Sequence, residues 1–163
     1  PIPRAMVGIL TALPGTALWR RLAREHRLRC ASGGDQFDRP NFAPAMCDAP
    51  LMAGYRKLLA GLFTADAYFR RCIRHLEEAP IRSAALRSGA VSTFFRALWR
   101  LGVVGSRRRW FWKLVLTGLR RAGLPSVPRA ITLAILGEHL IRYTEEEVLP
   151  RLDRALAAAP SGA

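Results

Sequence analysis

The apolar and polar positions of this chain follow two different patterns, and the first lies near its start. Residues 6–13 form a short apolar run, rich in β-branched side chains, which Pro14 and Gly15 close. Such a run, bounded by turn residues, is typical of a buried strand in a parallel sheet. Thr16 is a good helix N-cap, and apolar residues follow it at helical spacing to about Leu28. We therefore predict one strand–turn–helix unit, whose sheet partners would lie upstream because a single strand forms no sheet.

Helical spacing governs the second pattern, which begins at Asp48 and continues to the end of the chain. Gly123 is a typical helix stop, and Thr144 with Glu147 forms a capping box that predicts the start of a last helix. Between the two patterns lies a long mixed segment, residues 30–50, whose two phenylalanines favour an ordered loop. We predict a mainly α fold, a leftover βα unit followed by a small helical domain, with helices beginning at or near these residues: Asp48, Thr64, Ala90, Ser106, Val127 and Thr144.

Composition adds a strong positive charge to this picture. The chain of 163 residues has a formal net charge of +14, and arginine supplies 24 of its 26 basic side chains. Such a balance is compatible with contact to phosphates, to an anionic membrane surface or to an acidic neighbouring domain. A coding bias toward arginine would produce it as well, and the sequence leaves these explanations open. No apolar run is long enough for a transmembrane helix.

Few residues carry recognisable chemistry. The three cysteines, at wide and irregular spacing, match neither a disulfide framework nor a metal site, so we expect reduced thiols and a cytoplasmic location. No phosphate-binding glycine loop, metalloprotease motif or nucleophile elbow is present. The three histidines lie in separate segments, and His139 is the best candidate because a glutamate, an arginine and a tyrosine lie within four residues of it.

The basic, aromatic segment 107–113 is the most suggestive binding feature. Arginines interleaved with tryptophans suit either stacking on nucleic-acid bases or the headgroup boundary of a lipid membrane. The same residues also have the spacing of an ordinary helix with one core face and one solvated, charged face. A free-standing basic helical module that binds nucleic acid or an anionic membrane is thus an alternative function for the chain.

Taken in order, several segments resemble successive landmarks of B12-binding radical SAM proteins. The first resembles a late barrel strand and its turn, the second the loop that follows, and the others the uncharacterised domain at the C-terminus of that family. The resemblance extends over about residues 6–155 and is carried by these segments: 7–18, 34–42, 54–59, 67–72 and 137–144.

The resemblance implies three regions within this chain. Residues 1–29 would be the last βα unit of a radical SAM barrel, residues 30–50 an ordered loop, and residues 51–163 the helical C-terminal domain. The parent enzyme would carry a [4Fe-4S] cluster on a CxxxCxxC loop, use S-adenosylmethionine and cobalamin, and methylate a small molecule or a lipid. Neither the cluster cysteines nor the DxHxxG cobalamin motif is present here. We therefore expect this segment to bind no cofactor and to be inert alone.

The same resemblance implies where residues of this chain would meet the reaction. Thr11, Ala12 and Leu13 would lie at the edge of the S-adenosylmethionine pocket, because active sites of barrel enzymes lie at the carboxyl ends of the strands. The partners would be the upstream barrel and cobalamin domains, with no nucleic acid and with a peripheral membrane contact left open. Candidates to face the substrate are Asp35, Gln36, Asp38, Asn41 and His139.

Overall fold

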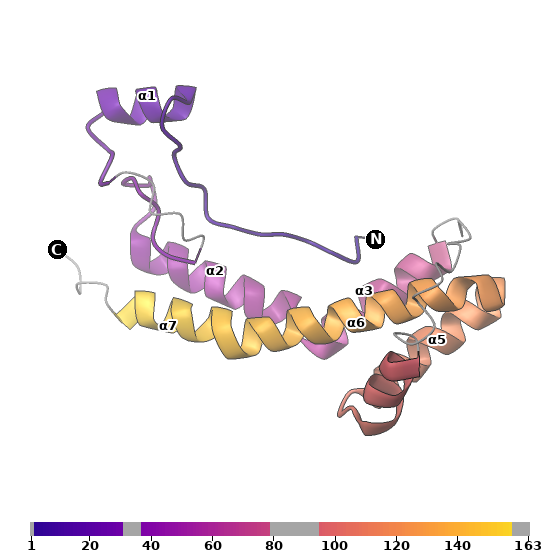
Figure 1. The fold of residues 1–163 in the computed structure, drawn as a ribbon. Coiled ribbons are helices and arrows are strands. Elements are labelled where there is room, and N and C mark those ends of the chain that lie inside the picture. The colour runs from indigo at the N-terminus through magenta and orange to yellow at the C-terminus, as the bar shows by residue number, and fades with distance from the viewer. Residues whose placement is uncertain (1, 31–36, 79–94, 158–163) are drawn as a thin grey trace. The chain divides into compact units, whose positions relative to one another are not determined.

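The computed structural model describes residues 2–30, 37–78 and 95–157 (Figure 1). These residues are mainly helical, as predicted. Four predicted helix starts lie within two residues of observed ones, whereas the start predicted at Ala90 lies outside the described residues; the four are Asp48, Thr64, Ser106 and Val127. In chain order the elements are α1 (Ala17–Arg24), α2 (Asp48–Leu62), α3 (Ala65–Glu78), the π-helix η1 (Leu98–Val104), α5 (Arg108–Ala122), the 3-10 helix η2 (Leu124–Ser126), α6 (Val127–Tyr143), the π-helix η3 (Thr144–Val148) and α7 (Leu149–Ala157).

The chain divides into two compact units. Unit 1 comprises residues 1–5 and 62–142, and unit 2 comprises residues 6–61 and 143–163. Unit 1 therefore holds α3, η1, α5, η2 and nearly all of α6, whereas unit 2 holds α1, nearly all of α2, η3 and α7. Each unit is described separately below.

Helix boundaries follow local capping interactions. The hydroxyl of Thr16 accepts a hydrogen bond from the Trp19 amide at 3.2 Å and starts α1. Thr64 does the same for the Ala67 amide at 3.2 Å and starts α3. Gly123, with φ of +68°, ends α5 while its amide bonds to the Leu119 carbonyl at 2.8 Å. These three caps are the ones that the sequence predicts.

The strand predicted over residues 6–13 is not formed within the described part of the chain. The backbone there is extended but belongs to no strand. A strand needs a neighbour, and the described residues supply only one isolated antiparallel bridge, between Leu28 and Phe42. The helical half of the predicted βα unit is present as α1, so what is missing is the sheet that would receive the strand.

The predicted helix start at Thr144 is wrong. Tyr143, immediately before it, has helical φ and ψ of −59° and −41°, and no side chain caps a helix there. The helix instead continues through the π-helical turn η3 into α7, and the Leu149 amide bonds to the Thr144 carbonyl. Pro150 has no amide hydrogen to give to an α-helical partner, and such a widened turn is a common way to accommodate that loss.

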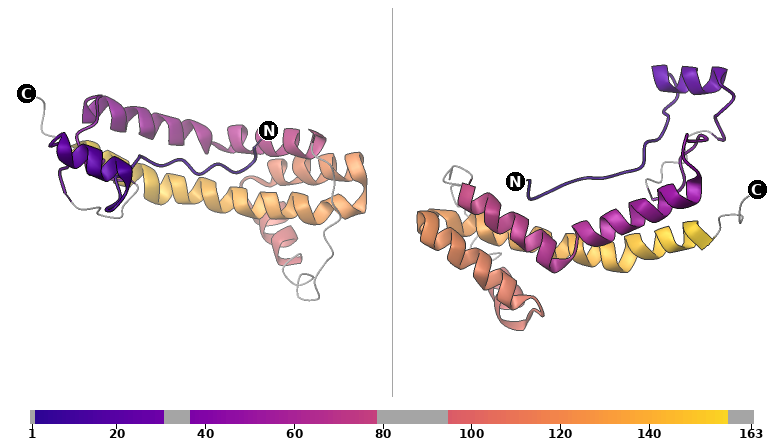
Figure 2. Two further views of the ribbon diagram at one scale, coloured as in Figure 1. Left: turned by 90° about the horizontal axis from the view of Figure 1, so that it is seen from above. Right: turned by 180° about the vertical axis from the view of Figure 1, so that it is seen from behind.

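Unit 1 is built around the packing of α3, α5 and α6, which lie side by side in Figure 2. The fully buried Tyr68 on α3 donates a hydrogen bond from its hydroxyl to the Leu133 carbonyl on α6 at 2.9 Å. Phe69 stacks on Trp110 of α5 with ring centroids 5.7 Å apart. Gly137 lets α6 approach closely, because a Cβ atom there would lie 2.3 Å from the Tyr68 ring. Aromatic side chains thus join all three helices.

Candidate functional site

Residues 6–13 in unit 2, called here the docking segment, have the side-chain pattern of a strand without a sheet. Exposure alternates along the segment up to Ala12: Met6 and Leu10 are 96% and 63% exposed, whereas the residues between them at odd positions are half-buried. Alternation with a period of two is the signature of extended backbone with one covered and one open face. The open face carries large apolar side chains.

Asn41 holds the C-terminal end of the docking segment. Its side chain is 4% exposed, and its Oδ1 accepts the Ala12 amide at 2.9 Å while its Nδ2 donates to the Ala12 carbonyl at 2.8 Å. The carboxamide therefore satisfies both backbone groups of Ala12, as a neighbouring strand would. The Asn41 carbonyl in turn accepts the Arg29 amide at 2.9 Å. One residue thus joins the docking segment, the chain after α1 and the loop before α2.

A second hydrogen bond holds the other end of the docking segment. Tyr55 on α2 donates from its hydroxyl to the Val7 carbonyl at 2.9 Å. Between the two anchors, the backbone groups of residues 8–11 make no hydrogen bond with any other described residue. Unpaired amides and carbonyls in a row form a template for pairing with another strand. The docking segment is held at both ends and open in the middle.

These hydrogen bonds limit which groups of Thr11, Ala12 and Leu13 are available to line a cofactor pocket. Ala12 is fully buried, and Asn41 occupies both of its backbone groups. The Leu13 carbonyl accepts the amide and the hydroxyl of Thr16, at 3.2 and 2.7 Å. Only the half-buried side chain of Thr11 and the exposed side chain of Leu13 stay available to line a pocket. Their role beside S-adenosylmethionine stays a prediction.

The predicted substrate-facing residues of the loop differ in their exposure to solvent. Asn41 is buried as described, which makes it a structural bridge in this unit. Asp38 is exposed and accepts the amide of the next residue, Arg39, at 2.7 Å. Asp38 also lines an open pocket of about 390 Å³ together with Arg151 and Arg154 of α7. Asp35 and Gln36 lie outside the described residues.

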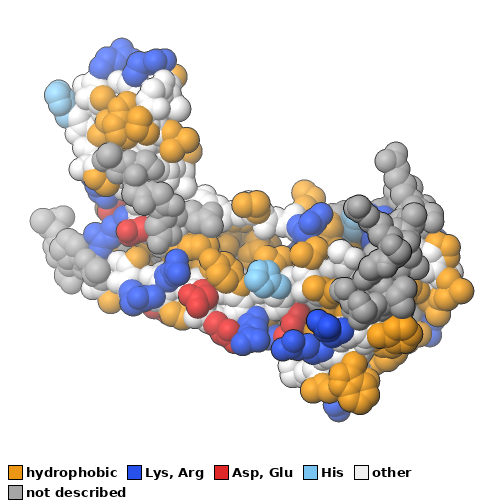
Figure 3. Space-filling view, in the orientation of Figure 1, with side chains coloured by type: hydrophobic (Ala, Val, Ile, Leu, Met, Phe, Trp, Pro, Cys, Tyr) orange, Lys and Arg blue, Asp and Glu red, His pale blue; other side chains and the backbone are white. Residues whose placement is uncertain are grey.

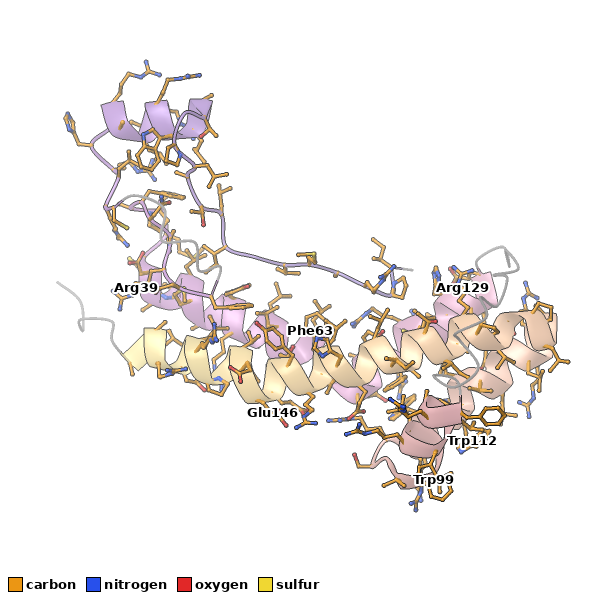
Figure 4. The ribbon with its side chains drawn as sticks, in the orientation of Figure 1. Arg39, Phe63, Trp99, Trp112, Arg129 and Glu146 are labelled. Atoms are coloured by element: carbon orange, nitrogen blue, oxygen red, sulfur yellow. The ribbon has the colours of Figure 1, made fainter. Side chains whose placement is uncertain are left out.

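The loop reaches that pocket because Arg39 anchors it to α7. The Arg39 guanidinium, labelled in Figure 4, donates to the Ala155 carbonyl at 3.3 Å. Phe37 packs edge-on against Tyr143, with ring centroids 6.4 Å apart. A carboxylate beside two arginines could hold a polar ligand that carries both a positive and a negative group.

His139 lies in unit 1, exposed on α6, where it lines a second open pocket of about 570 Å³. Three arginines, Arg96, Arg100 and Arg142, line the same pocket, which sequence reasoning did not single out. The signal was the spacing of Arg96 and Arg100, four residues apart and hence on one helical face. The predicted His139 therefore belongs to a cationic pocket rather than to the Asp38 pocket of unit 2. Its role toward substrate stays a prediction.

Cys72 and His75 of α3 lie against neighbouring side chains. Cys72 is buried, and burial raises the pKa of its thiol above the ordinary value. His75 is in contact with Arg129 of α6, Nη2 to Nε2 at 2.6 Å. Among the residues that the structure describes, no three His, Cys, Asp or Glu side chains group as metal ligands do. Within those same residues no helix has both the length and the apolar character needed to cross a membrane.

Comparisons with known proteins give one family and one relative for this chain. A family model described as Domain of unknown function (DUF4070) matches residues 16–150. A protein of Synechocystis sp. (strain ATCC 27184 / PCC 6803 / Kazusa), named uncharacterized methyltransferase sll1242, is 31% identical over 152 residues. That match covers 88% of this chain but only 28% of the relative, so the chain spans just over a quarter of the relative's length. No solved structure matches the chain.

Proposed function

Because this chain belongs to the family described as Domain of unknown function (DUF4070), we propose that it is the C-terminal, barrel-closing and substrate-covering region of a cobalamin-dependent radical SAM methyltransferase. The name of the Synechocystis relative supports the methyltransferase part of this proposal. The ordered motifs that resemble B12-binding radical SAM proteins support the radical SAM and cobalamin part.

The open docking segment is the observation that carries the proposal. Its backbone is extended, fixed at Val7 and Ala12, and unpaired between them among the described residues. Exposing Met6 and Leu10 to water is unfavourable, at roughly 25 cal/mol for each Å² of apolar surface. Addition to the edge of a parallel sheet in the rest of the protein would pair the amides and carbonyls that face that edge and cover both side chains. The segment would then be a strand of the catalytic barrel.

The cofactors of such an enzyme would be held by other parts of the protein. A [4Fe-4S] cluster needs cysteines close together, but Cys30 and Cys47 are exposed on loops of unit 2 and Cys72 is buried in α3 of unit 1. These thiols do not fit a cluster, and we assign this chain no step that involves one. Its contribution would be the side chains of Thr11 and Leu13, at the carboxyl end of the added strand, where barrel enzymes place their active sites.

The helical part of the chain would cover the reaction. Water must be excluded where a reactive species forms, and a helical layer above the barrel opening does this without taking part in the chemistry. The substrate would be a small molecule or a lipid. Asp38, beside Arg151 and Arg154, is the described loop residue with a pocket in which a polar part of the substrate could lie.

Hydrogen–deuterium exchange on the full-length protein tests this assignment. We expect the amides of residues 8–11 that face the sheet, which alternate along the segment, to be protected to the same extent as those in the middle of α2, because the sheet would pair them. In parallel, Leu10→Lys would place a charge in a covered position and should reduce the formation of 5′-deoxyadenosine from S-adenosylmethionine, whereas Leu10→Ile should not. Fast exchange at residues 8–11 together with full activity of Leu10→Lys would contradict the proposal.

A further inference from the structure

The positive charge of the chain is concentrated in one of its two units. Unit 1 contains 16 Arg and Lys residues against four Asp and Glu, whereas unit 2 contains ten against eight. Within unit 1, residues 79–137 form a stretch of 59 residues without a single acidic side chain, which carries 11 basic residues and three of the four tryptophans. Arginine usage alone would not remove the acids, so a coding bias does not account for this distribution.

An aromatic stripe is exposed within the described part of this acid-free stretch. Phe95, Trp99 and Val103 follow one another at intervals of four residues, and Phe95 and Trp99 are 63% and 66% exposed. Trp99 is labelled in Figure 4, where it lies at the outer end of η1. The space-filling view in Figure 3 shows hydrophobic side chains gathered over this region, with Lys and Arg side chains beside them. Large exposed aromatic side chains grouped in this way mark an interaction surface.

The arginine pocket lies next to the stripe on the same helix. It is lined by Arg96 and Arg100, one position after Phe95 and Trp99, and by apolar residues that include Val104 and Ile135. Glu138 is its one acidic residue, and the Arg107 guanidinium engages that carboxylate at 2.9 Å. No ion pair joins Arg96 or Arg100 to an acidic residue of the described chain. The pocket therefore presents cations over an apolar lining.

We propose that this face of unit 1, the aromatic stripe together with the arginine pocket, binds the surface of an anionic lipid bilayer. Tryptophan and phenylalanine favour the boundary between headgroups and acyl chains, where one end of the ring is wet and the other apolar. Arg96 and Arg100 lie beside the inserted stripe, at the level where lipid phosphates would be. An anionic bilayer attracts each such arginine by about 1 kcal/mol, which corresponds to about fivefold in affinity.

The geometry favours a bilayer over nucleic acid. In the basic segment 107–113 the aromatic faces are not free for base stacking, because Trp110 stacks on Phe69 and lies under the Lys113 ammonium, which is 5.3 Å from the ring centroid. Trp112 is held by a hydrogen bond from its Nε1 to the Gly102 carbonyl at 2.9 Å. The exposed aliphatic residues of the stripe and pocket have no use in stacking, whereas a bilayer covers aliphatic and aromatic side chains alike. This inference does not depend on the proposed function.

Vesicle flotation of the chain in its natural full-length context tests the proposal. The probes are vesicles of phosphatidylcholine with about one-third phosphatidylglycerol, and vesicles of phosphatidylcholine alone. We expect binding to the anionic vesicles that weakens as salt is added, and much weaker binding to the neutral ones. Arg96→Gln with Arg100→Gln should lower the affinity about 25-fold, and Trp99→Ala about tenfold. Both arginines and Trp99 are exposed, so the variants should keep the fold.

The matched controls are Arg20→Gln with Arg24→Gln on α1, and Leu58→Ala on α2. These residues are exposed and belong to unit 2, whereas the proposed surface belongs to unit 1. The first control removes the same charge, and the second removes an exposed apolar side chain. Their affinities should stay within about twofold of the wild-type value. The proposal is overturned by an absence of vesicle binding, by an equal loss in both arginine pairs, or by tighter binding to duplex RNA than to the anionic vesicles at the same salt.

Discussion

Asn41 shows how one buried polar side chain can take the place of a missing strand. Its carboxamide both donates to and accepts from Ala12, while its own carbonyl accepts the Arg29 amide. A buried backbone group without a partner costs about 1–3 kcal/mol, so a side chain that satisfies two such groups fixes the local path of the chain. The docking segment keeps its position in unit 2 for this reason.

Replacement of Asn41 by alanine should therefore lower the free energy of unfolding by about 2–4 kcal/mol, because it leaves the amide and the carbonyl of Ala12 unpaired. Urea unfolding followed by circular dichroism measures this. Asp38→Ala is the control: Asp38 is exposed and bonds only to the next amide, so its loss should cost less than about 0.5 kcal/mol. Similar costs for the two variants would contradict the role of Asn41.

Cys72 gives unit 1 a dependence on pH. Burial raises the pKa of the Cys72 thiol in the folded chain, whereas in the unfolded chain it titrates near the ordinary value of about 8.5. Above that value the unfolded state releases a proton that the folded state keeps, so the unfolded state is favoured. The free energy of unfolding should therefore be independent of Cys72 ionisation below about pH 8 and should fall as the pH rises through about 9. Burial raises the pKa of Tyr68 as well, which adds the same trend at higher pH.

Urea unfolding of the wild type and of Cys72→Ala across this pH range would measure the effect. The variant loses packing, so its stability should be lower at every pH, but its slope between pH 8 and 9.5 should be smaller than that of the wild type. Equal slopes would assign the pH dependence to other groups. The exposed Cys30 and Cys47 are present in both proteins and cancel in the comparison.

Among the elements, α6 and α2 contain glycines with opposite roles. Gly137 on α6 lies against the ring of Tyr68, so the Cβ of Gly137→Ala would lie 2.3 Å from a ring carbon. Tyr68 is fully buried and bonded to Leu133, so it has little freedom to move. We expect Gly137→Ala to cost more than about 2 kcal/mol of unfolding free energy. Chemical unfolding of the purified variant measures this.

Gly54 provides the matched control for Gly137. It lies inside α2, and a Cβ atom there would have nothing within 4 Å. Gly54→Ala should therefore raise the free energy of unfolding by about 0.5–1 kcal/mol, because alanine is the better helix former. The two glycine-to-alanine changes should thus have opposite signs. If both changes were stabilising, α6 would not approach α3 closely at Gly137.

The accuracy of the sequence predictions at this scale depends on the range of the interaction. Thr16, Thr64 and Gly123 each act within four residues, and the helix ends that they predict are present. The capping box at Thr144 is equally local in appearance, but the helix already running through Tyr143 overrides it. The strand depends on a sheet that the described residues do not contain. Most helix boundaries could thus be predicted from sequence, whereas the strand stays a prediction that needs the rest of its sheet.

The candidate sites depend on even longer separations. Asn41 meets Ala12 across 29 residues, and the arginine pocket brings Arg96 and Arg100 beside Arg142. No local pattern shows which of many arginines converge. The polar loop around Asn41 could be singled out from its composition, and so could His139, but the buried and bridging role of Asn41 required coordinates.

At the scale of the whole molecule, the unequal charge of the two units predicts unequal responses to salt. Unit 1 has 16 basic residues against four acidic ones, so repulsion among like charges opposes its folding, whereas the ten and eight charges of unit 2 nearly balance. Dissolved salt screens such repulsion over distances of about 10 Å at 0.1 M. Raising the ionic strength should therefore stabilise unit 1 and leave unit 2 almost unchanged.

Native-state hydrogen exchange resolves the two units within one sample, so unit 2 is an internal control. Between low salt and about 0.3 M sodium chloride, amides in the middle of α3 and α5 should exchange several-fold more slowly, because opening of unit 1 becomes less favourable. Amides in the middle of α2 should change by less than about twofold. Equal slowing in all three helices would mean that salt acts on the chain as a whole. Faster exchange in α3 and α5 would mean that attractive ion pairs, such as Arg107 with Glu138, outweigh the repulsion in unit 1.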